Sequence, residues 1–523
     1  MLYDGFRKLT AGFYALLSAS ILALLLVVRP FVHYSYEATF LRPNILLLAF
    51  AILPALILTI ILWNRRRGME TILKNRSPFI ILWGSVILFL LQVTICCNAY
   101  FVTGWDAWTV LSQAYRLASN QPMAVTYFSR YPNNLLLLWI DSLIFRACFA
   151  FGVTNMIMGT YAILLIQCML SVLAGWLLYD LCLHSIRSYL ISFCGWLCYA
   201  VYIGLSPWLL IPYSDSMGLW IPVFLLWLYQ RIREKPQTRS LWCVMGAAAA
   251  IGYEIKPQAA ILTIAVILVE LFSAFQGVRQ KTKIWSVLKK ILLLIVSAAV
   301  MQTAGTAFLI PATHMEALDS RRSFGPSHFF MMGLNNESDG GYLQKDVDFS
   351  ASFHTPVQRK RAEMRVASER LQSDGCVGLL KHLTKKSLIN YGDGTFAWGV
   401  EGSFYMQLLP VDNPLAQLLR GIFYKGGKYY ACFSSVQQSL WLLLLFSSLF
   451  SAPVVWKRRK SRTLLTAELS VIGLTAFELL FEARARYLYL YTPIFIFTAV
   501  YGWKYFFAFL QNQFSHNDKE EKP

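Results

Sequence analysis

The chain has 523 residues, of which 57% are hydrophobic and 14% charged, and its mean hydropathy is +0.49. This composition excludes a water-soluble domain, and the long uninterrupted apolar runs exclude a transmembrane β-barrel, whose strands alternate. The net charge of +19 gathers in short loops between apolar segments. That distribution is typical of cytoplasmic loops in membrane proteins and does not indicate a nucleic-acid partner.

Apolar segments that approach the roughly 20 residues of a spanning helix follow one another along most of the chain. They are 9–28, 44–63, 78–98, 135–150, 156–180, 189–206, 216–230, 240–254, 258–272, 291–310, 435–455, 463–481 and 488–506. Lipid requires backbone groups that are satisfied within each segment, so we expect an all-α polytopic membrane protein with about 12–13 transmembrane helices. The first segment lacks a small-residue cleavage site and is interpreted as an uncleaved span.

Basic clusters give an expected topology. They lie near 65–76, 231–239, 279–290 and 457–462. If these clusters lie on the cytoplasmic side, both termini are cytoplasmic. The topology then has twelve crossings, provided that one of the segments 135–150 and 156–180 does not span the membrane fully. The sequence leaves open which of the two segments that is. The expected division is a membrane module at 1–310 with an outer loop at 99–134, an extracytoplasmic segment at 311–434, C-terminal membrane helices at 435–510 and a cytoplasmic tail at 511–523.

Asp106 is the first candidate site residue. It follows an apolar segment and is the only acidic side chain between Glu70 and Asp141. A carboxylate at a membrane boundary is costly unless water, a partner or a substrate compensates it. The same outer loop contains Arg130 and the Tyr131-Pro132 turn. A solvated loop residue is the simpler alternative for Asp106.

Further charged residues fall at the same outer face in the expected topology. They are Asp215, Glu254, Lys256, Glu482, Arg484 and Arg486. Such a set offers carboxylates for proton transfer and cations for a phosphate group. Each has an ordinary alternative, because Asp215 can cap a helix, Lys256 can extend to the interface, and Glu482 with Arg486 can form a helical ion pair. His328 is a further candidate for a substrate contact in the outer segment.

These residues resemble elements of the GT-C superfamily of membrane glycosyltransferases, which includes protein O-mannosyltransferases and lipid A aminoarabinose transferases. The resemblance covers most of the chain. It is carried by Asp106, Tyr131-Pro132-Asn133, Tyr213-Ser214-Asp215, Ile255-Lys256-Pro257 and Glu482-Ala483-Arg484-Ala485-Arg486-Tyr487-Leu488. Residues 328–334, 340–342 and 392–398 are similar to segments of membrane proteins from Gram-positive bacteria.

The resemblance implies transfer of a sugar, with inversion, from a polyprenyl-phosphate donor to an extracytoplasmic acceptor. The acceptor would be a cell-wall glycopolymer, a teichoic acid or a protein. Asp106 would be the general base. The donor phosphate would be bound by Lys256, Arg484, Arg486 and Arg130, and the sugar or acceptor would be bound or oriented by Asp215, Glu482, Tyr131 and His328. Many relatives carry two adjacent acids in the first loop, whereas Ala107 follows Asp106 here, so a divalent metal cofactor is left open.

Three other functions fit parts of the sequence. A transporter or lipid flippase is the first, although such proteins often show repeats and polar residues at the bilayer midplane. Here no repeat is evident and the midplane of most predicted spans is apolar. A cell-wall polymer ligase would also use acidic and basic residues of outer loops. A scaffold would use the 311–434 segment to bind a partner.

Overall fold

The structure is a computed structural model that describes residues 2–275, 280–457 and 461–520. It is 79% helical with almost no strand, which confirms the predicted all-α polytopic class. In these ranges ten helices are long and apolar enough to cross a membrane, and shorter apolar helices occupy Tyr189–Gly204 and Ser240–Ile255. Parts of two predicted basic loops, 276–279 and 458–460, and the end of the predicted tail, 521–523, lie outside the described residues.

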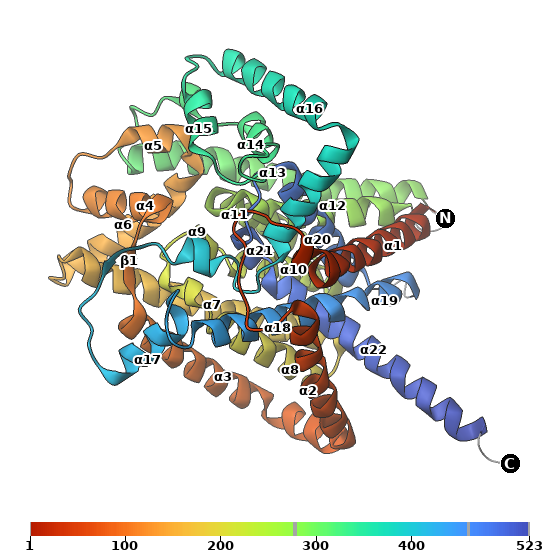
Figure 1. Cartoon of the computed structure of the whole chain (residues 1–523). Coiled ribbons are helices and arrows are strands. Elements are labelled where there is room, and N and C mark those ends of the chain that lie inside the picture. Colours follow the sequence, from red (N-terminus) through yellow and green to blue (C-terminus); the bar gives the residue numbers. More distant parts are fainter. Residues whose placement is uncertain (1, 276–279, 458–460, 521–523) are drawn as a thin grey trace.

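The membrane region combines helices from both ends of the chain (Figure 1). Its N-terminal helices are α1 (Leu2–Ala23), α2 (Asn44–Asn64), α3 (Arg66–Ala99), α6 (Leu135–Ala150), α7 (Met156–Ile186), α8 (Tyr189–Tyr199), α10 (Trp220–Glu234), α11 (Ser240–Ile255), α12 (Ala260–Ala274) and α13 (Gln280–Ala312). Its C-terminal helices are α18 (Tyr430–Leu449), α19 (Ala452–Lys457), α20 (Arg462–Leu480) and α22 (Thr492–Glu520). Helix α18 packs on α2 and α22, and α20 packs on α12, so the two groups form one bundle.

Two predicted spans differ from the observed helices. Segment 216–230 is divided, because the short helix α9 (Ser214–Met217) precedes α10 and only α10 continues into the bundle. Of 135–150 and 156–180, the first forms a helical stretch of 19 residues with the preceding turn and the second a helix of 31 residues. Both are long enough to span, so helix length does not identify a segment that stops short.

Helices outside the predicted spans occupy the loop 99–134 and the segment 311–434. They are α4 (Trp105–Ala118), α5 (Val125–Arg130), α14 (Pro326–Gly333), α15 (Gln344–Ala351), α16 (Pro356–Tyr391) and α17 (Pro414–Phe423). Figure 1 shows α4, α5 and α15 on the side of the molecule away from both termini. Helix α16 begins at Pro356 after the capping residue Thr355 and bends at Gly375, whose φ of 57° is left-handed. Helix α16 is therefore two helical pieces joined at a kink.

A two-stranded sheet joins the loop 99–134 to the segment 311–434. Strand β1 (Phe101–Thr103) pairs antiparallel with β2 (Tyr405–Leu408), and Phe101 lies opposite Leu408. The Phe101 and Tyr405 rings also meet edge to face at 4.6 Å. This pairing places residues 398–408 against the loop that carries Asp106.

Candidate functional site

Asp215 and Lys256 form a buried ion pair. Asp215 lies in α9, and Lys256 lies in the turn that follows α11; they are 1% and 5% exposed. The Lys256 ammonium donates to the Asp215 carboxylate. Glu254, although two residues from Lys256, instead accepts a hydrogen bond from Gln302 of α13. Asp215 thus binds a cation from a distant part of the chain.

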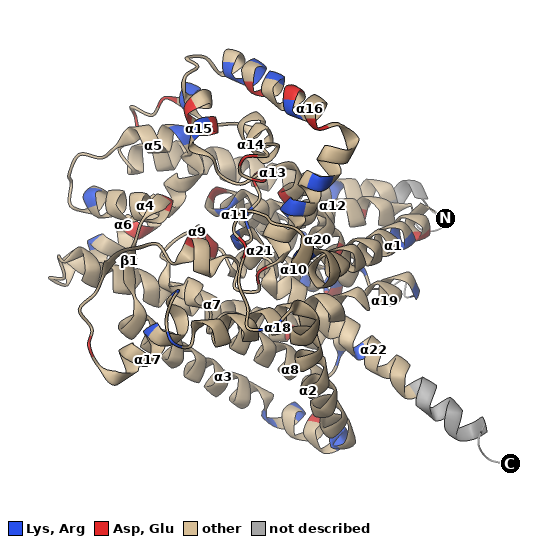
Figure 2. Cartoon of the chain, in the orientation of Figure 1, with Lys and Arg blue, Asp and Glu red and all other residues tan. Residues whose placement is uncertain are grey.

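Two arginines extend this pair into a larger group. Arg486, in α21 (Arg486–Tyr489), lies 3.7 Å from Asp215 and 3.1 Å from the Glu401 carboxylate. Arg484 lies 2.8 Å from the same Glu401 oxygen and 2.6 Å from Glu482. The six residues that make up this charge cluster are Asp215, Lys256, Glu401, Glu482, Arg484 and Arg486. Figure 2 shows acidic and basic residues around α9, α11 and α21 in the interior of the fold.

Aromatic rings enclose the cations of the charge cluster. The Arg486 guanidinium lies 4.4 Å from the Trp105 ring and 6.0 Å from Tyr213. The Lys256 ammonium lies 4.7 Å from the Tyr487 ring. Trp105 and Tyr213 meet edge to face at 5.1 Å. Cation–aromatic contacts of this kind strengthen when water is excluded, as it is here.

Asp106 directly follows Trp105 and is half-buried. The Tyr127 hydroxyl is a hydrogen-bond partner of the Asp106 carboxylate. Tyr127 in turn accepts a 2.9 Å hydrogen bond from the Asn134 amide, whose oxygen is 3.4 Å from the Tyr213 hydroxyl. Burial raises the pKa of Tyr127 well above its ordinary value, and the charges of Tyr213 and Asp106 raise it further. Tyr127 therefore stays protonated and holds Asp106 by donating a hydrogen bond.

Tyr131 follows Arg130 and packs against the rings of Tyr127 and Phe324. Burial raises the pKa of Tyr131, and the carboxylates of Asp106 and Glu482 both add to that shift. The pKa of Tyr342 is raised by burial and then by Asp106, whereas the Arg484 guanidinium lowers it. Both tyrosines thus feel the charge of Asp106 and the charge of a cluster residue, Glu482 for Tyr131 and Arg484 for Tyr342.

Arg130 differs from the other predicted cations. Its backbone carbonyl accepts a 3.1 Å hydrogen bond from Phe324. Its charge acts on the adjacent Tyr131. Within the described ranges no ion pair joins its guanidinium to the charge cluster. Arg130 therefore borders the Asp106 loop without belonging to the cluster.

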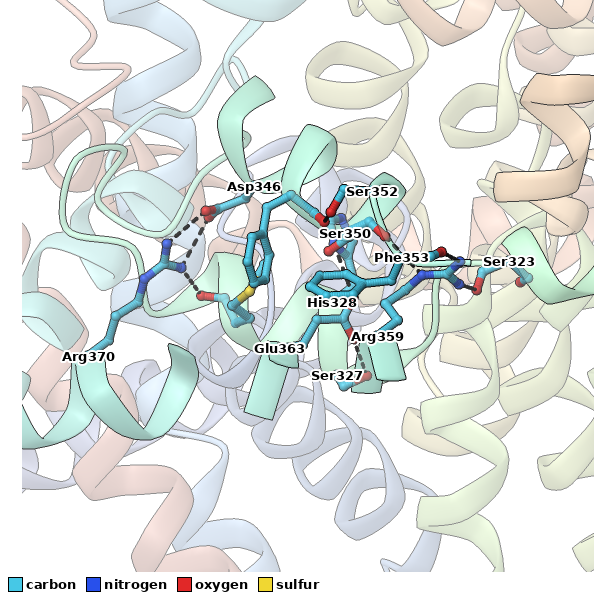
Figure 3. Close-up of polar contacts among 12 residues, drawn as sticks. Ser323, Ser327, His328, Asp346, Ser350, Ser352, Phe353, Arg359, Glu363 and Arg370 are labelled. Atoms are coloured by element: carbon cyan, nitrogen blue, oxygen red, sulfur yellow. Dashed lines mark hydrogen bonds and ion pairs between the residues drawn. The ribbon is translucent and has the colours of Figure 1, made fainter. Parts of the chain in front are cut away.

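His328 lies in a separate polar core of the outer segment (Figure 3). It is 0% exposed, and its Nδ1 is 2.7 Å from the Ser350 hydroxyl and 3.9 Å from Glu363. Phe324 stacks on the imidazole at 4.3 Å. Burial lowers the pKa of His328 to about 4, so the ring is neutral near pH 7. With no exposed surface, His328 stabilises the packing of α14, α15 and α16 in this conformation and has no face available to a sugar.

The charge cluster contains three carboxylates and three cations. Burial lowers the pKa of Lys256, as does the charge of Arg486, while Glu478 and Glu401 oppose the shift. Burial alone would raise the pKa of Glu482, but Arg484 outweighs it and holds that pKa below its ordinary value. Glu482 is therefore ionised, and mutual pairing compensates for the loss of hydration.

Three contributors were missed by sequence reasoning: Glu401, Tyr127 and Tyr487. Glu401 was open to prediction, because it is the only acid between Asp393 and Asp412 in a segment rich in glycine and aromatic residues. The tyrosines carried no such signal, since aromatic residues are common at membrane interfaces regardless of function. Tyr487 donates a 3.0 Å hydrogen bond to Glu482.

The carboxylates of the site bear on whether it could hold a metal ion. In the described part of the chain, no three His, Cys, Asp or Glu side chains are placed together to hold an ion. Divalent cations such as Mg²⁺ and Ca²⁺ favour several oxygen ligands, whereas the carboxylates here face arginine and lysine. The residues do not fit a metal, and no chemical step is derived through one.

One family model matches nearly the whole chain. Residues 9–507 match the model of a family described as "conserved hypothetical integral membrane protein" (CHIM_prot). The chain belongs to this family. No curated protein matches the chain. The family assignment agrees with the membrane helices of the fold.

Proposed function

We propose that this integral membrane protein is a GT-C-type glycosyltransferase that moves a sugar from a polyprenyl-phosphate donor to an extracytoplasmic acceptor. The acceptor would be a cell-wall glycopolymer, a teichoic acid or a protein. One observation carries the proposal: Arg486 of the charge cluster stacks on Trp105, the residue immediately before Asp106. An acid and a set of cations are thereby brought within reach of a single substrate.

The proposed reaction assigns one role to each side of the site. Asp106 removes the proton of an acceptor hydroxyl as its oxygen forms a bond to the anomeric carbon. The bond between that carbon and the phosphate oxygen breaks, and the electron pair leaves with the lipid phosphate. Lys256, Arg484 and Arg486 stabilise the negative charge on this leaving group. Attack opposite the leaving group accounts for inversion.

The remaining predicted residues orient these groups. Asp215 and Glu482 hold Lys256 and Arg484 in place by direct ion pairs. Tyr131 feels the charges of both Asp106 and Glu482, and its hydroxyl would bind a sugar hydroxyl. Arg130 would act from the rim of the Asp106 loop.

Glu401 adds a condition to donor binding. Its carboxylate lies between two guanidinium groups, which is the place that a phosphate would take. Planar guanidinium groups bind carboxylates and phosphates with similar geometry. Donor binding would therefore require the Glu401 side chain to turn away or to share the arginines.

The proposed location is the cell membrane, with both termini in the cytoplasm and the site at the outer face. The distribution of basic residues along the sequence supports this orientation. Helix α4, which contains Asp106, and helix α5 lie on the side of the molecule away from both termini (Figure 1).

Replacing Asp106 by Asn tests the proposal in cells. Envelope glycans are compared among the wild type, a deletion strain and an Asp106→Asn strain, with membrane insertion checked by immunoblot. We expect Asp106→Asn to lose the same glycan signal as the deletion. Asp412→Asn is the matched control, because Asp412 is exposed and hydrogen-bonded only locally, to Gln417. A normal glycan profile in a correctly inserted Asp106→Asn protein would remove Asp106 as the base.

One observation favours a second candidate, a lipid or polysaccharide transporter. Asp141 lies inside α6, is 0% exposed, and neither of its carboxyl oxygens has a hydrogen-bond partner among the described residues. Ionisable residues inside membrane helices often mark ion or proton pathways. Loss of function in Asp141→Asn together with full function in Asp106→Asn would favour the transporter.

A further inference from the structure

Three consecutive arginines connect α2 to α3. Arg65, Arg66 and Arg67 are all exposed, and together with Trp63, Met69 and Ile72 they line a cavity of about 690 Å³. These six residues are called the arginine pocket. The pocket combines cations with apolar side chains, so it suits a ligand that has both an anionic and an apolar part.

The arginines of the pocket have no acidic partner in the protein. Glu70 is the only acid between Glu37 and Asp106. Its carboxylate is already occupied, because it accepts hydrogen bonds from the amides of Tyr189 and Leu190 at the start of α8, at 2.7 and 2.9 Å. In the described ranges, none of the three arginines forms an ion pair. Their charge is therefore left for a ligand to compensate.

Other basic residues at helix ends are paired within the protein. Arg231 binds Asp180 and lies 3.1 Å from Glu234. Arg462 lies 3.4 Å from Glu270. The preference for basic residues in cytoplasmic loops explains on which side such residues lie, but it applies equally to paired and unpaired ones. The lack of acidic partners thus distinguishes the arginine pocket from these sites.

The arginine pocket lies where a lipid-facing helix ends. Helix α2 contains the most apolar stretch of the bundle, and only 11% of that stretch is buried inside the protein. At its end the Arg66 guanidinium lies 3.8 Å from the Trp63 ring, and tryptophan is typical of the membrane–water boundary. Helix α2 packs on α18, whereas α3 packs on α7 and α8, and Figure 1 shows the two helices diverging from their connection. The pocket therefore faces the head groups of the surrounding lipid.

The pocket is remote from the charge cluster. Helix α3 has 34 residues and joins the pocket at its first end to the Asp106 loop at its other end. At 1.5 Å per residue it is about 51 Å long, which exceeds the thickness of the hydrocarbon core. A ligand of the pocket is therefore not the substrate of the proposed reaction.

We infer that the arginine pocket binds the head group of an anionic phospholipid of the bilayer, whose acyl chains lie against apolar side chains of α2 and α3. Guanidinium groups donate paired hydrogen bonds to phosphate oxygens. A head group such as phosphatidylcholine carries its own cation, which the arginines repel, whereas phosphatidylglycerol carries only the negative phosphate. The pocket thus selects lipids by charge and does so independently of the proposed reaction.

Lipid competition tests the inference. Purified protein is placed in nanodiscs of phosphatidylglycerol and phosphatidylcholine at a ratio of about 1:9, and the lipids that stay bound are identified by native mass spectrometry. We expect phosphatidylglycerol to be enriched on the wild type, and Arg65→Gln/Arg67→Gln to lower its relative affinity about tenfold, a change of about 1.4 kcal/mol. Lys235→Gln/Arg239→Gln is the matched control, because it removes two exposed cations from another loop that the proposed topology places on the same side. It should keep the enrichment.

A conservative variant separates lost binding from misfolding. Arg65→Lys/Arg67→Lys keeps both charges and should retain most of the enrichment. Both variants should melt like the wild type in nanodiscs of phosphatidylcholine alone, because these side chains are exposed. No enrichment on the wild type, or an equal loss in the Lys235→Gln/Arg239→Gln control, would reduce the pocket to general surface attraction and overturn the inference. Either result would leave the proposed function standing, because the two sites lie at opposite ends of α3.

Discussion

Arg484 and Arg486 direct their guanidinium groups at the same oxygen of Glu401, at 2.8 and 3.1 Å. Two like charges at such short range repel strongly in a buried site, and the shared carboxylate offsets that repulsion. Lys256 is balanced in the same way by Asp215. At the scale of single residues, the carboxylates of Asp215 and Glu401 thus hold the cations of the site in place. A bound anion can take the position of such a carboxylate.

Glu401→Gln should therefore destabilise the protein and make it respond to anions. Removing one partner of a buried ion pair typically costs about 3–5 kcal/mol. We expect the free energy of unfolding to fall by about that amount, and added phosphate to restore part of it, in thermal unfolding followed by fluorescence. Glu369→Gln is the control, since Glu369 forms an exposed pair with Arg365, and such pairs contribute about 1 kcal/mol or less. Equal destabilisation by the two variants would contradict this account.

At the scale of elements, α16 fixes the segment that carries the arginines. The Lys386 ammonium donates to the carbonyls of Gly333 and Phe481, at 2.8 and 2.5 Å. The Ala483 amide donates to the Gly340 carbonyl at 2.8 Å. The outer segment and the end of α20 are therefore one unit, and the position of Glu482 and Arg484 depends on it.

Lys386 gives this unit a pH dependence. Burial lowers the pKa of Lys386 from 10.5 to about 7, while Glu478 and Glu482 oppose the shift. Between about pH 7 and pH 10.5 the unfolded chain binds a proton that the folded chain does not, so this group makes stability rise with pH in that window. We expect Lys386→Met to flatten that rise in melting temperature measured from pH 7 to 10. An unchanged slope in the variant would show that Lys386 does not carry the effect.

At the scale of the whole molecule, much of the fold was predictable from the sequence. Apolar runs of helical length identified the membrane helices, because lipid leaves few alternatives for the backbone. The division of 216–230 into α9 and α10 was not predicted. Its only mark in the sequence is Gly218, within an otherwise continuous apolar run. Tertiary contacts, and not composition, decide such interruptions.

The candidate site was predictable in part. Asp215, Lys256, Glu482, Arg484 and Arg486 lie in one cluster, whereas Glu254 and Arg130 do not join it. The ion pairs themselves were not predicted, because Lys256 binds Asp215 and not the nearby Glu254. The burial of His328 was not predicted, since it follows from the packing of α14 against α16, which no local pattern reveals. The contact of Glu401 with the arginines was not predicted, because it depends on a long-range contact, the pairing of β1 with β2.

The orientation in the membrane can be tested with a native cysteine. Cys376 is exposed in α16, within the segment expected outside. A membrane-impermeant maleimide should label Cys376 in intact cells, as read by mass spectrometry of its peptide. Thr71→Cys, an exposed position in α3 near the first basic cluster, should be labelled only after lysis. The reverse pattern would invert the proposed topology.

The most direct test of the central claim separates binding from transfer. Purified protein in nanodiscs is supplied with labelled lipid-linked sugars and acceptor material from the cell envelope, and donor binding and sugar transfer are both measured. The account predicts that Asp106→Asn binds donor normally but loses transfer by about 10²–10⁴-fold, because only the base is removed, whereas Arg486→Gln loses donor binding. Transfer at the wild-type rate by Asp106→Asn, or normal donor binding by Arg486→Gln, would contradict a single site built from the first outer loop and the charge cluster.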